Sequence, residues 1–373
     1  MSEHLYKNIY LRYRSNREPE GFTGKNCIHE LPKSMHKKQH CGYISYDVKN
    51  KIEDLSSKHP DHLGFPEICF FEVDEVLDRA AIKELFLKPI SKKKYSKINI
   101  RQRVSKAEHI NSIKRIKAHI QRGDIYEMNY CVEFYAENAL IDPISIFEKL
   151  NAIAEAPFSS FMKFNEHYII SSSPERFLKR TGTKLISQPI KGTAARGKTK
   201  KEDDNLRSQL KKSLKDRTEN VMIVDLVRND LSRIAKEGTV KVTELFGIHS
   251  FKQIHQMISS ISCELNKNIT FNDIIRATFP MGSMTGAPKV SAMELIEKFE
   301  CTKRGVYSGA MGMIEPNGNF DLSVVIRTIL YNSKKKYLSF MVGSAITASS
   351  DPEKEYEECM LKAKGMLLSL GMK

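Results

Sequence analysis

One lysine beside an apolar segment is the residue of this chain with the clearest potential for chemistry. Lys191 follows the β-prone residues 185–190 and precedes Gly192, which tolerates unusual backbone angles. Burial disfavours an ammonium group and lowers its pKa, and the free amine that results is a nucleophile. An ordinary surface lysine at a strand end fits the same pentapeptide, so the neighbouring motifs have to decide between the two interpretations.

A second candidate for chemistry is Glu175, in the motif Ser-Ser-Ser-Pro-Glu-Arg-Phe at residues 171–177. It directly follows Pro174, so we expect a tight and constrained turn. A carboxyl group that is shielded from water has a raised pKa and can donate a proton. A glutamate in a surface turn is the alternative interpretation of this motif.

Three further glutamates have the spacing of a cation site. Glu219 shares a predicted helical face with Ile223, so its carboxylate points toward protein and needs a partner. Glu355 and Glu358 lie one turn apart and repel each other unless a cation lies between them. Together the three could form the all-oxygen site that Mg²⁺ prefers. The alternatives are a buried salt bridge for Glu219 and a solvated acidic helix start for the other two.

The segment 279–289 resembles an anion-binding loop. Two glycines and two hydroxyl residues, Ser283 and Thr285, precede a predicted helix start at Pro288. Free backbone N–H groups at such a start can bind a carboxylate or a phosphate. The order of residues is not that of a Walker loop. An ordinary capped helix is the alternative.

The composition excludes several classes of protein. The 373 residues are 40% hydrophobic, enough for one large domain or for two or three smaller ones. No run of 18 apolar residues is present and the N-terminus has no apolar signal core, so we expect no membrane association. The seven cysteines are scattered without a CxxC pair, which is typical of the reducing cytoplasm.

The net charge of +15 allows two interpretations. A nucleic-acid-binding protein is one of them. The basic residues are dispersed, however, and no helix-turn-helix, zinc-finger or RNP signature accompanies them. We therefore favour the attraction of a small anionic substrate and expect no nucleic-acid partner.

The elements that must position these residues suggest an α+β protein with large antiparallel sheets, because strands and helices are mixed and several links have hairpin length. We expect residues 1–40 to be an irregular lead-in with one short strand, followed by a catalytic domain over 41–373. A capping box at Ser105 predicts a helix to about Arg122, and Asp351 followed by a proline predicts the start of the last helix. Another long helix is predicted over 204–236, and the predicted strands are 42–47, 68–73, 130–135, 161–171, 184–190, 239–246, 306–314, 323–331 and 337–342.

Taken in order, these motifs resemble the chorismate-utilising enzymes, which include anthranilate synthase, aminodeoxychorismate synthase, and the isochorismate and salicylate synthases. The resemblance runs from about Gly42 to the C-terminus and is densest over 171–363. It implies one large α+β domain of two stacked antiparallel sheets with flanking helices, and an active site in a cleft between the sheets.

The resemblance also implies roles for particular residues. Glu219, Glu355 and Glu358 would hold Mg²⁺, which binds the ring carboxylate of chorismate. Glu175 would be the general acid for the leaving C4 hydroxyl. The residues that would contact the substrate are Tyr307, Arg327, Gly343, Ser283, Thr285, His255 and Thr193. Among these, Tyr307 and Arg327 would hold the enolpyruvyl carboxylate.

Within the family, Lys191 is similar to the lysine of aminodeoxychorismate synthase, since other members usually have a small residue there. In that mechanism the lysine attacks C2, the C4 hydroxyl leaves and ammonia adds at C4. The product is 4-amino-4-deoxychorismate, on the route to 4-aminobenzoate and folate, and the amination is classed with the transaminases. Glu127 stands where water-using members have a lysine and ammonia-using members commonly have a glutamine.

The source of ammonia follows from an absent motif. The chain has no Gly-x-Cys-x-Gly segment of a glutamine amidotransferase, so we expect ammonia from a separate amidotransferase subunit or from free ammonium. Anthranilate synthase component I is the nearest enzyme alternative, and Lys191 argues against it. A basic nucleic-acid-binding protein is the alternative that is not an enzyme.

Overall fold

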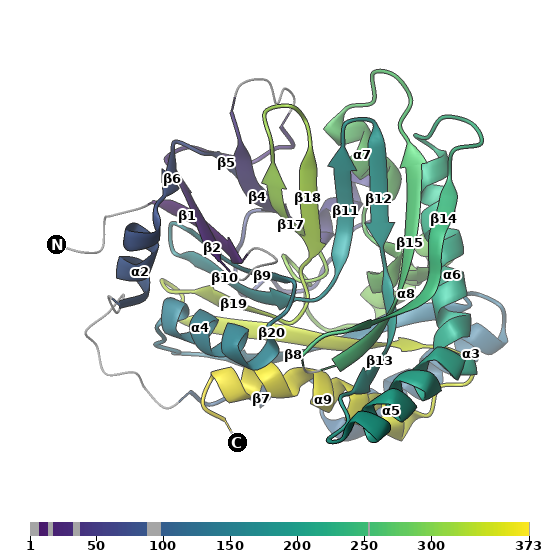
Figure 1. The fold of residues 1–373 in the computed structure, drawn as a ribbon. Helices are drawn as coiled ribbons and strands as arrows, with labels where there is room; N and C mark the ends of the chain where they lie inside the picture. Colours follow the sequence, from purple (N-terminus) through teal and green to yellow (C-terminus); the bar gives the residue numbers. More distant parts are fainter. Residues whose placement is uncertain (1–6, 14–17, 33–37, 88–97, 253, 373) are drawn as a thin grey trace.

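The computed structural model describes residues 7–13, 18–32, 38–87, 98–252 and 254–372. Two ten-stranded antiparallel sheets form its centre (Figure 1). One apolar core fills the space between the sheets and extends to helices behind the second sheet, and another lies between the first sheet and its own helices. The prediction of an α+β fold with two stacked antiparallel sheets is therefore confirmed.

The first sheet begins with residues that we expected to be irregular. β1 and β2 pair with each other, and β1 also pairs with β9, so this part of the lead-in belongs to the sheet. Ile9 and Leu11 contribute to one core and Tyr10 to the other, so β1 is buried on both faces and lacks the alternation of polar and apolar residues that would have revealed it. The strands of the first sheet are β1 (Asn8–Tyr13), β2 (Pro19–Gly24), β6 (Glu75–Leu77), β7 (Arg101–Gln102), β8 (Glu127–Ala136), β9 (Phe158–Phe164), β10 (His167–Ser173), β16 (Gly286–Ala287), β19 (Thr328–Asn332) and β20 (Tyr337–Ile346).

The second sheet carries Lys191, although not at a strand end as expected. Pro189 separates β12 from β13, and Lys191 is the second residue of β13. Proline has no backbone N–H to donate, which explains why the predicted strand 184–190 stops before it. The strands of the second sheet are β3 (Cys27–Ile28), β4 (His40–Ile44), β5 (Ile68–Glu72), β11 (Arg176–Thr181), β12 (Lys184–Gln188), β13 (Ile190–Ala195), β14 (Lys241–Ser250), β15 (Ile254–Glu264), β17 (Ala310–Ile314) and β18 (Phe320–Val324).

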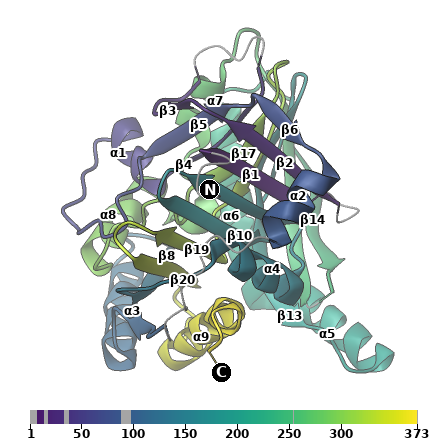
Figure 2. The ribbon, with the colours of Figure 1, turned by 90° about the vertical axis from the view of Figure 1, so that its left-hand side faces the viewer.

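Helices cover both sheets (Figures 1 and 2). α3, α4 and α9 pack on the first sheet, while α5 and α6 pack on strands β13 and β15 of the second. The predicted helix starts are confirmed, because Ser105 forms a capping box and the Asp351 side chain accepts two backbone N–H bonds. The helices are α1 (Lys49–Ile52), α2 (Arg79–Leu87), α3 (Lys106–Gln121), α4 (Pro143–Ala154), α5 (Lys200–Lys212), α6 (Leu214–Ser232), α7 (Phe271–Thr278), α8 (Lys289–Phe299) and α9 (Pro352–Ser369), with 3₁₀ turns at Tyr46–Val48 and Gly282–Met284.

The single long helix predicted over 204–236 is wrong. α5 ends at Lys212, and Ser213 takes an extended conformation between the two helices. The Ser213 side chain accepts a hydrogen bond from the Asp216 backbone N–H at the start of α6. Serine competes with the helical backbone for hydrogen bonds in this way, so it favours a cap over a helix interior.

Two other predicted strands are also divided. Residues 161–171 form the hairpin of β9 and β10, and residues 323–331 form β18 and β19, which belong to different sheets. The chain crosses between the sheets at Arg327, whose φ is +53°. It makes an equivalent crossing at Glu175, between β10 and β11. The crossings lie side by side, since Val324 N donates to Glu175 O (3.0 Å) and Ser172 N donates to Arg327 O (3.1 Å).

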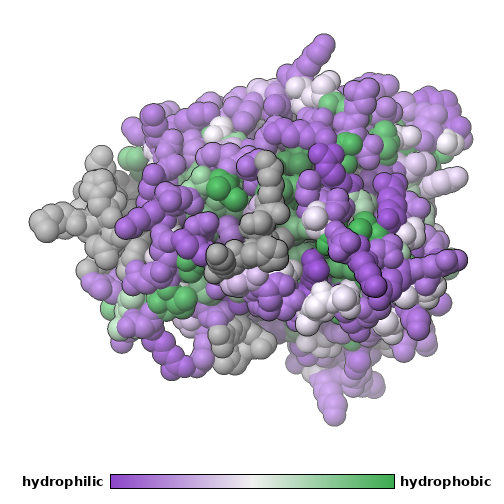
Figure 3. Space-filling model, turned by 90° about the horizontal axis from the view of Figure 1, so that it is seen from above, coloured by the Kyte–Doolittle hydropathy of each residue, from purple (hydrophilic) through white to green (hydrophobic). Residues whose placement is uncertain are grey.

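The outer surface formed by the described residues is largely polar. Seen from above, the molecule is largely hydrophilic, and apolar side chains form small separate areas (Figure 3). None of the helices in the described ranges is long and apolar enough to cross a membrane.

Candidate active site

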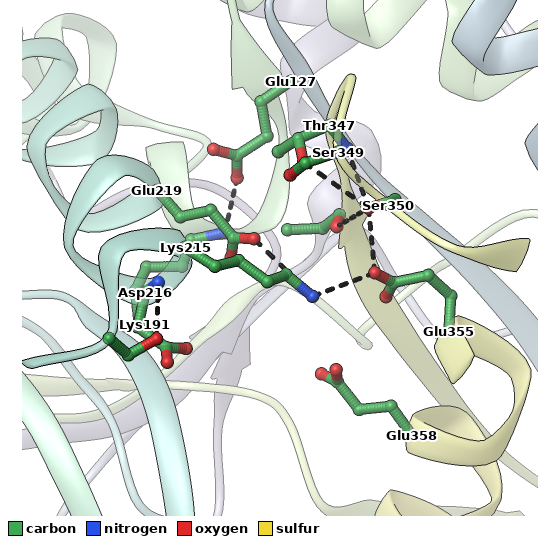
Figure 4. Close-up of polar contacts among 12 residues, drawn as sticks. Glu127, Lys191, Lys215, Asp216, Glu219, Thr347, Ser349, Ser350, Glu355 and Glu358 are labelled. Carbon is green, nitrogen blue, oxygen red and sulfur yellow. Dashed lines mark hydrogen bonds and ion pairs between the residues drawn. The ribbon is translucent and has the colours of Figure 1, made fainter. Parts of the chain in front are cut away.

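An ion pair between the two sheets is the centre of the candidate site. Lys191 Nζ on β13 donates to Glu127 Oε1 at the start of β8, 2.5 Å away (Figure 4). The exposed fractions of the two side chains are only 8% and 1%. The interpretation of Lys191 as a surface residue is therefore wrong.

The backbone next to Lys191 has the unusual geometry that the sequence predicted. The pairing of β13 with β15 shifts register between Ile190 and Thr193. Gly192 has a φ of +89°, and a Cβ at this position would lie 2.9 Å from Asp216 Cβ on α6. Only glycine adopts this conformation readily, and only glycine lets β13 approach α6 so closely.

The pKa of Lys191 shifts in the direction opposite to our expectation. Burial alone would lower it, but the carboxylates of Glu127, Glu219 and Glu175 outweigh burial, so the pKa is raised above the ordinary lysine value. At neutral pH Lys191 is therefore an ammonium group. It must lose a proton before it can act as a nucleophile.

Glu175 has the properties predicted for a proton donor. It lies at a sheet crossing and is buried. Burial raises its pKa to about 7, and nearby groups that include Lys191 partly oppose this rise. A carboxyl group with this pKa is substantially protonated at neutral pH.

The three predicted metal ligands face lysines in this structure. Lys215 Nζ lies 3.1 Å from Glu355 Oε1 and 3.9 Å from Glu219 Oε1 (Figure 4). Lys362 Nζ lies 2.6 Å from Glu358 Oε1. In the part of the chain that the structure describes, no three His, Cys, Asp or Glu side chains converge closely enough to hold a metal ion.

The donor set nevertheless fits a hard divalent cation. Glu219 Oε1 and Glu355 Oε2 are buried, and among the described residues neither has a hydrogen-bond partner. Burial raises the pKa of Glu219 to about 7, where Lys191 opposes the rise and Glu127 adds to it. These carboxylate oxygen atoms could bind a divalent cation if Lys215 moved away. The site residues fit Mg²⁺ chemically, and its presence stays a prediction.

Some of the predicted substrate contacts lie around α9. Lys362 Nζ donates to Gly343 O at 2.8 Å, and Arg327 Nη1 lies 3.4 Å from Lys362 O. The Arg327 guanidinium is also within electrostatic reach of Tyr307 and Glu358. The Tyr307 hydroxyl is 3.8 Å from Cys131 Sγ. The structure therefore brings Arg327, Tyr307 and Gly343 together beside the glutamates.

The other four predicted contacts differ in their positions. Ser283 is buried beside the Glu175 carboxyl group, and it opposes the rise that burial causes in the Glu175 pKa. The Thr285 hydroxyl donates instead to backbone carbonyls of its own loop. Thr193 is exposed. Both ring nitrogens of His255 are occupied, at 2.8 Å from Ser250 Oγ and 2.9 Å from Asp203 Oδ1. The contact of Thr193 and His255 with a substrate stays a prediction.

The main residue that sequence reasoning missed is Lys215. It precedes Glu219 by four residues on α6, a spacing that favours a side-chain pair and could have been noticed. Its second partner, Glu355, lies 140 positions away on α9, and no local pattern predicts that contact.

Comparison with known proteins identifies the family of the chain. A family model described as chorismate binding enzyme matches residues 11–368. The chain belongs to this family. The predicted resemblance is thereby confirmed, and family membership argues against the nucleic-acid-binding alternative.

Relatives in the family carry more than one name. Aminodeoxychorismate synthase from Arabidopsis thaliana chloroplasts is 35% identical over 87% of this chain and 39% of its own length. Aminodeoxychorismate synthase component 1 from Klebsiella aerogenes is 33% identical over 88% of this chain and 76% of its own. Anthranilate synthase component 1 from Acetivibrio thermocellus is 33% identical over 88% of this chain and 74% of its own length. The chain spans less than two-fifths of the plant relative.

Solved structures share the fold. Anthranilate synthase component I from Streptococcus pneumoniae TIGR4 superposes with a TM-score of 0.77 and 23% identity, covering 96% of this chain and 89% of the other. The menaquinone-specific isochorismate synthase from Escherichia coli superposes with a TM-score of 0.77 and 17% identity, covering 98% of this chain and 89% of the other. Both have the two-sheet fold that the motifs implied.

Proposed function

We propose that this chain is the chorismate-aminating component of aminodeoxychorismate synthase and makes 4-amino-4-deoxychorismate from chorismate and ammonia. The observation that carries the proposal is Lys191, buried between the two sheets and surrounded by Glu127, Glu219 and Glu175. Relatives named aminodeoxychorismate synthase at 33% and 35% identity support it. A buried lysine among acids has a reactive role more readily than a structural one, because burying it costs free energy.

The proposed reaction begins with the proton on Lys191. Glu127, which already accepts a hydrogen bond from Nζ, takes that proton. The amine then attacks C2, and the C4–O bond breaks as Glu175 gives a proton to the hydroxyl, which leaves as water. Ammonia next forms a bond with C4, and the C2–N bond breaks to release Lys191. The pKa of about 7 supports Glu175 as the donor.

Charged groups of the substrate have matching partners in the proposal. Glu219, Glu355 and Glu358 would hold Mg²⁺, which when bound supplies positive charge to the ring carboxylate of chorismate. Arg327 pairs with the second carboxylate, because a planar guanidinium binds a carboxylate through two parallel hydrogen bonds. Lys362 lies next to both Arg327 and Glu358 and adds a further positive charge.

The ammonia source completes the proposal. We infer that a separate glutamine amidotransferase subunit supplies it, in the cytoplasm. The name component 1, carried by the Klebsiella aerogenes relative, supports a partner chain.

Anthranilate synthase component I remains the second candidate, because the Acetivibrio thermocellus relative is equally similar. The deciding experiment incubates the purified chain with chorismate, ammonium and Mg²⁺ and separates the products by mass. We expect 4-amino-4-deoxychorismate; anthranilate as the main product would favour the second candidate instead.

Lys191→Ala tests the proposed role of Lys191 as the nucleophile in the same assay. The substitution removes the nucleophile and opens a space beside C2, where water or ammonia can attack directly. We expect a large loss of the C4-amino product, with residual product substituted at C2. Near-normal C4 amination by this variant would remove Lys191 from the mechanism.

A further inference from the structure

The Lys215 ammonium group lies where a cation between α6 and α9 would lie. It is 3.1 Å from Glu355 Oε1 and 3.9 Å from Glu219 Oε1, and Figure 4 shows it between the two carboxylates. We propose that Lys215 is a resident counter-ion, which occupies the divalent-cation position of the cation-free chain and withdraws when the cation binds. This inference rests on the proposed metal-dependent function and adds a residue that sets the metal affinity.

The position of Lys215 in its helix is unfavourable without those acids. It is the second residue of α6, where the helix dipole places partial positive charge. A lysine there is repelled by its own helix, so the facing carboxylates of Glu219 and Glu355 must hold it. An occupant that depends on these two acids is displaced when a more highly charged cation binds them.

The carboxylates of Glu219 and Glu355 are buried, whereas the Lys215 side chain reaches solvent. The side chains of Glu219 and Glu355 are 9% and 2% exposed, while that of Lys215 is 45% exposed. The lysine can therefore turn its ammonium group into water at little cost, because a long cationic side chain readily keeps its charge solvated.

One ammonium group does not satisfy the site. Glu219 Oε1 and Glu355 Oε2 are buried and have no hydrogen-bond partner among the described residues. One ammonium group also faces two carboxylates at once. A divalent cation can bind oxygen atoms of both carboxylates and match their summed charge.

Lys362 provides an internal comparison. It pairs with Glu358 at 2.6 Å and also donates to Gly343 O at 2.8 Å, with 26% of its side chain exposed. Lys362 is therefore held both by a backbone carbonyl group and by a carboxylate. The two contacts of Lys215 in this cluster are both with acids, so Lys215 is the one whose hold is lost when a cation takes them.

The test measures binding of Mn²⁺, as a spectroscopic probe for the divalent site, by electron paramagnetic resonance without substrate. Lys215→Met keeps the length of the side chain and removes its charge. We expect it to bind Mn²⁺ about tenfold or more tightly than wild type, since the competing ammonium is gone. Its melting temperature without metal should fall, and should rise more than that of wild type when Mn²⁺ is added.

Matched variants control for general charge effects. Lys212→Met, at the exposed end of α5, changes the same residue type and should leave the affinity unchanged. Lys215→Arg keeps the positive charge and should not tighten binding. Equal or weaker Mn²⁺ binding by Lys215→Met overturns the proposal, as does the absence of binding in both wild type and Lys215→Met.

The proposed function is tested separately. A wild-type chain that aminates chorismate, with no difference in Mn²⁺ affinity between it and Lys215→Met, refutes the counter-ion role alone. Tighter Mn²⁺ binding by Lys215→Met, in a chain that makes no aminated product, refutes the proposed function alone.

Discussion

At the scale of single residues, the protonation state of Lys191 is decided by its acidic neighbours. Burial and ion pairing act in opposite directions on an ammonium group, and here three carboxylates outweigh burial. The sequence shows that Lys191 follows an apolar strand, and this correctly indicated burial. It does not show that Glu127, 64 positions earlier, would form a 2.5 Å contact. The predicted direction of the pKa shift was wrong for that reason.

Glu127→Gln tests this balance directly. The substitution keeps the shape and removes one of the charges that raise the Lys191 pKa, so a larger fraction of free amine is expected. Cyanate reacts with the neutral form of a lysine and not with its ammonium form, so we expect it to carbamylate Lys191 several-fold faster in the variant at pH 8. Peptide mass mapping gives the rate. Glu137→Gln, just beyond the end of β8, is the control, and equal rates in all three proteins would contradict the prediction.

Glu175→Gln tests the acid through stability. A carboxyl group whose pKa rises from 4.5 to about 7 on folding contributes stability below pH 4.5, which is lost as the pH rises through 7. Replacing Glu175 by glutamine removes this loss, so at pH 8 the variant should be more stable by up to about 3 kcal/mol while losing activity.

Urea unfolding at pH 5 and pH 8 measures this effect. Glu219 has a similarly raised pKa in both proteins, so the informative quantity is the difference between variant and wild type at each pH. A difference that does not change between the two pH values would show that Glu175 ionises normally in the folded chain.

At the scale of elements, local signals were sufficient for helix starts and insufficient for strand boundaries. The capping box at Ser105 and the N-cap at Asp351 depend on residues three positions apart or fewer, so the sequence predicts them well. The division of residues 323–331 between two sheets depends on partners far along the chain. The predicted strand is mostly apolar, and the charged Arg327 in its middle did not by itself indicate a crossing.

The break between α5 and α6 has a consequence for the site. Ser213 is the N-cap of α6 and lies two residues before Lys215. Its cap therefore fixes the start of the helix that positions the side chains of Lys215 and Glu219. We expect Ser213→Ala to lower stability by about 1 kcal/mol, as for other N-cap losses, and to weaken Mn²⁺-induced stabilisation. Thermal melts with and without Mn²⁺ measure both effects. Ser208→Ala, exposed on α5, should behave as wild type, and a silent Ser213→Ala would exclude the cap as a determinant of the site.

At the scale of the whole molecule, the fold class was obtained from motifs in their order along the chain, and the same motifs supplied the candidate site residues. Motif order indicates a family, and the family implies a two-sheet architecture that no single segment contains. The contact of Lys215 with Glu355 was not obtained, because it forms only after α6 and α9 pack.

The dependence on a partner chain is a prediction at this scale. Since the sequence has no glutaminase nucleophile motif, we expect amination of chorismate with ammonium salts and none with glutamine alone. Addition of an amidotransferase subunit should restore the use of glutamine. Turnover with glutamine by the purified single chain would contradict this expectation.

The paired sheet crossings also constrain how such a protein can change over time. Glu175 and Arg327 are carried by crossings that are hydrogen-bonded to each other, so a displacement of one segment displaces both groups. Glu175 and Arg327 therefore form a single structural unit that is inherited together. Lys191 and Glu127 lie on strands of opposite sheets and on neither crossing, so their side chains can be exchanged without moving either crossing. New chemistry in this fold can thus arise by replacing the residues at 127 and 191 while both crossings stay intact.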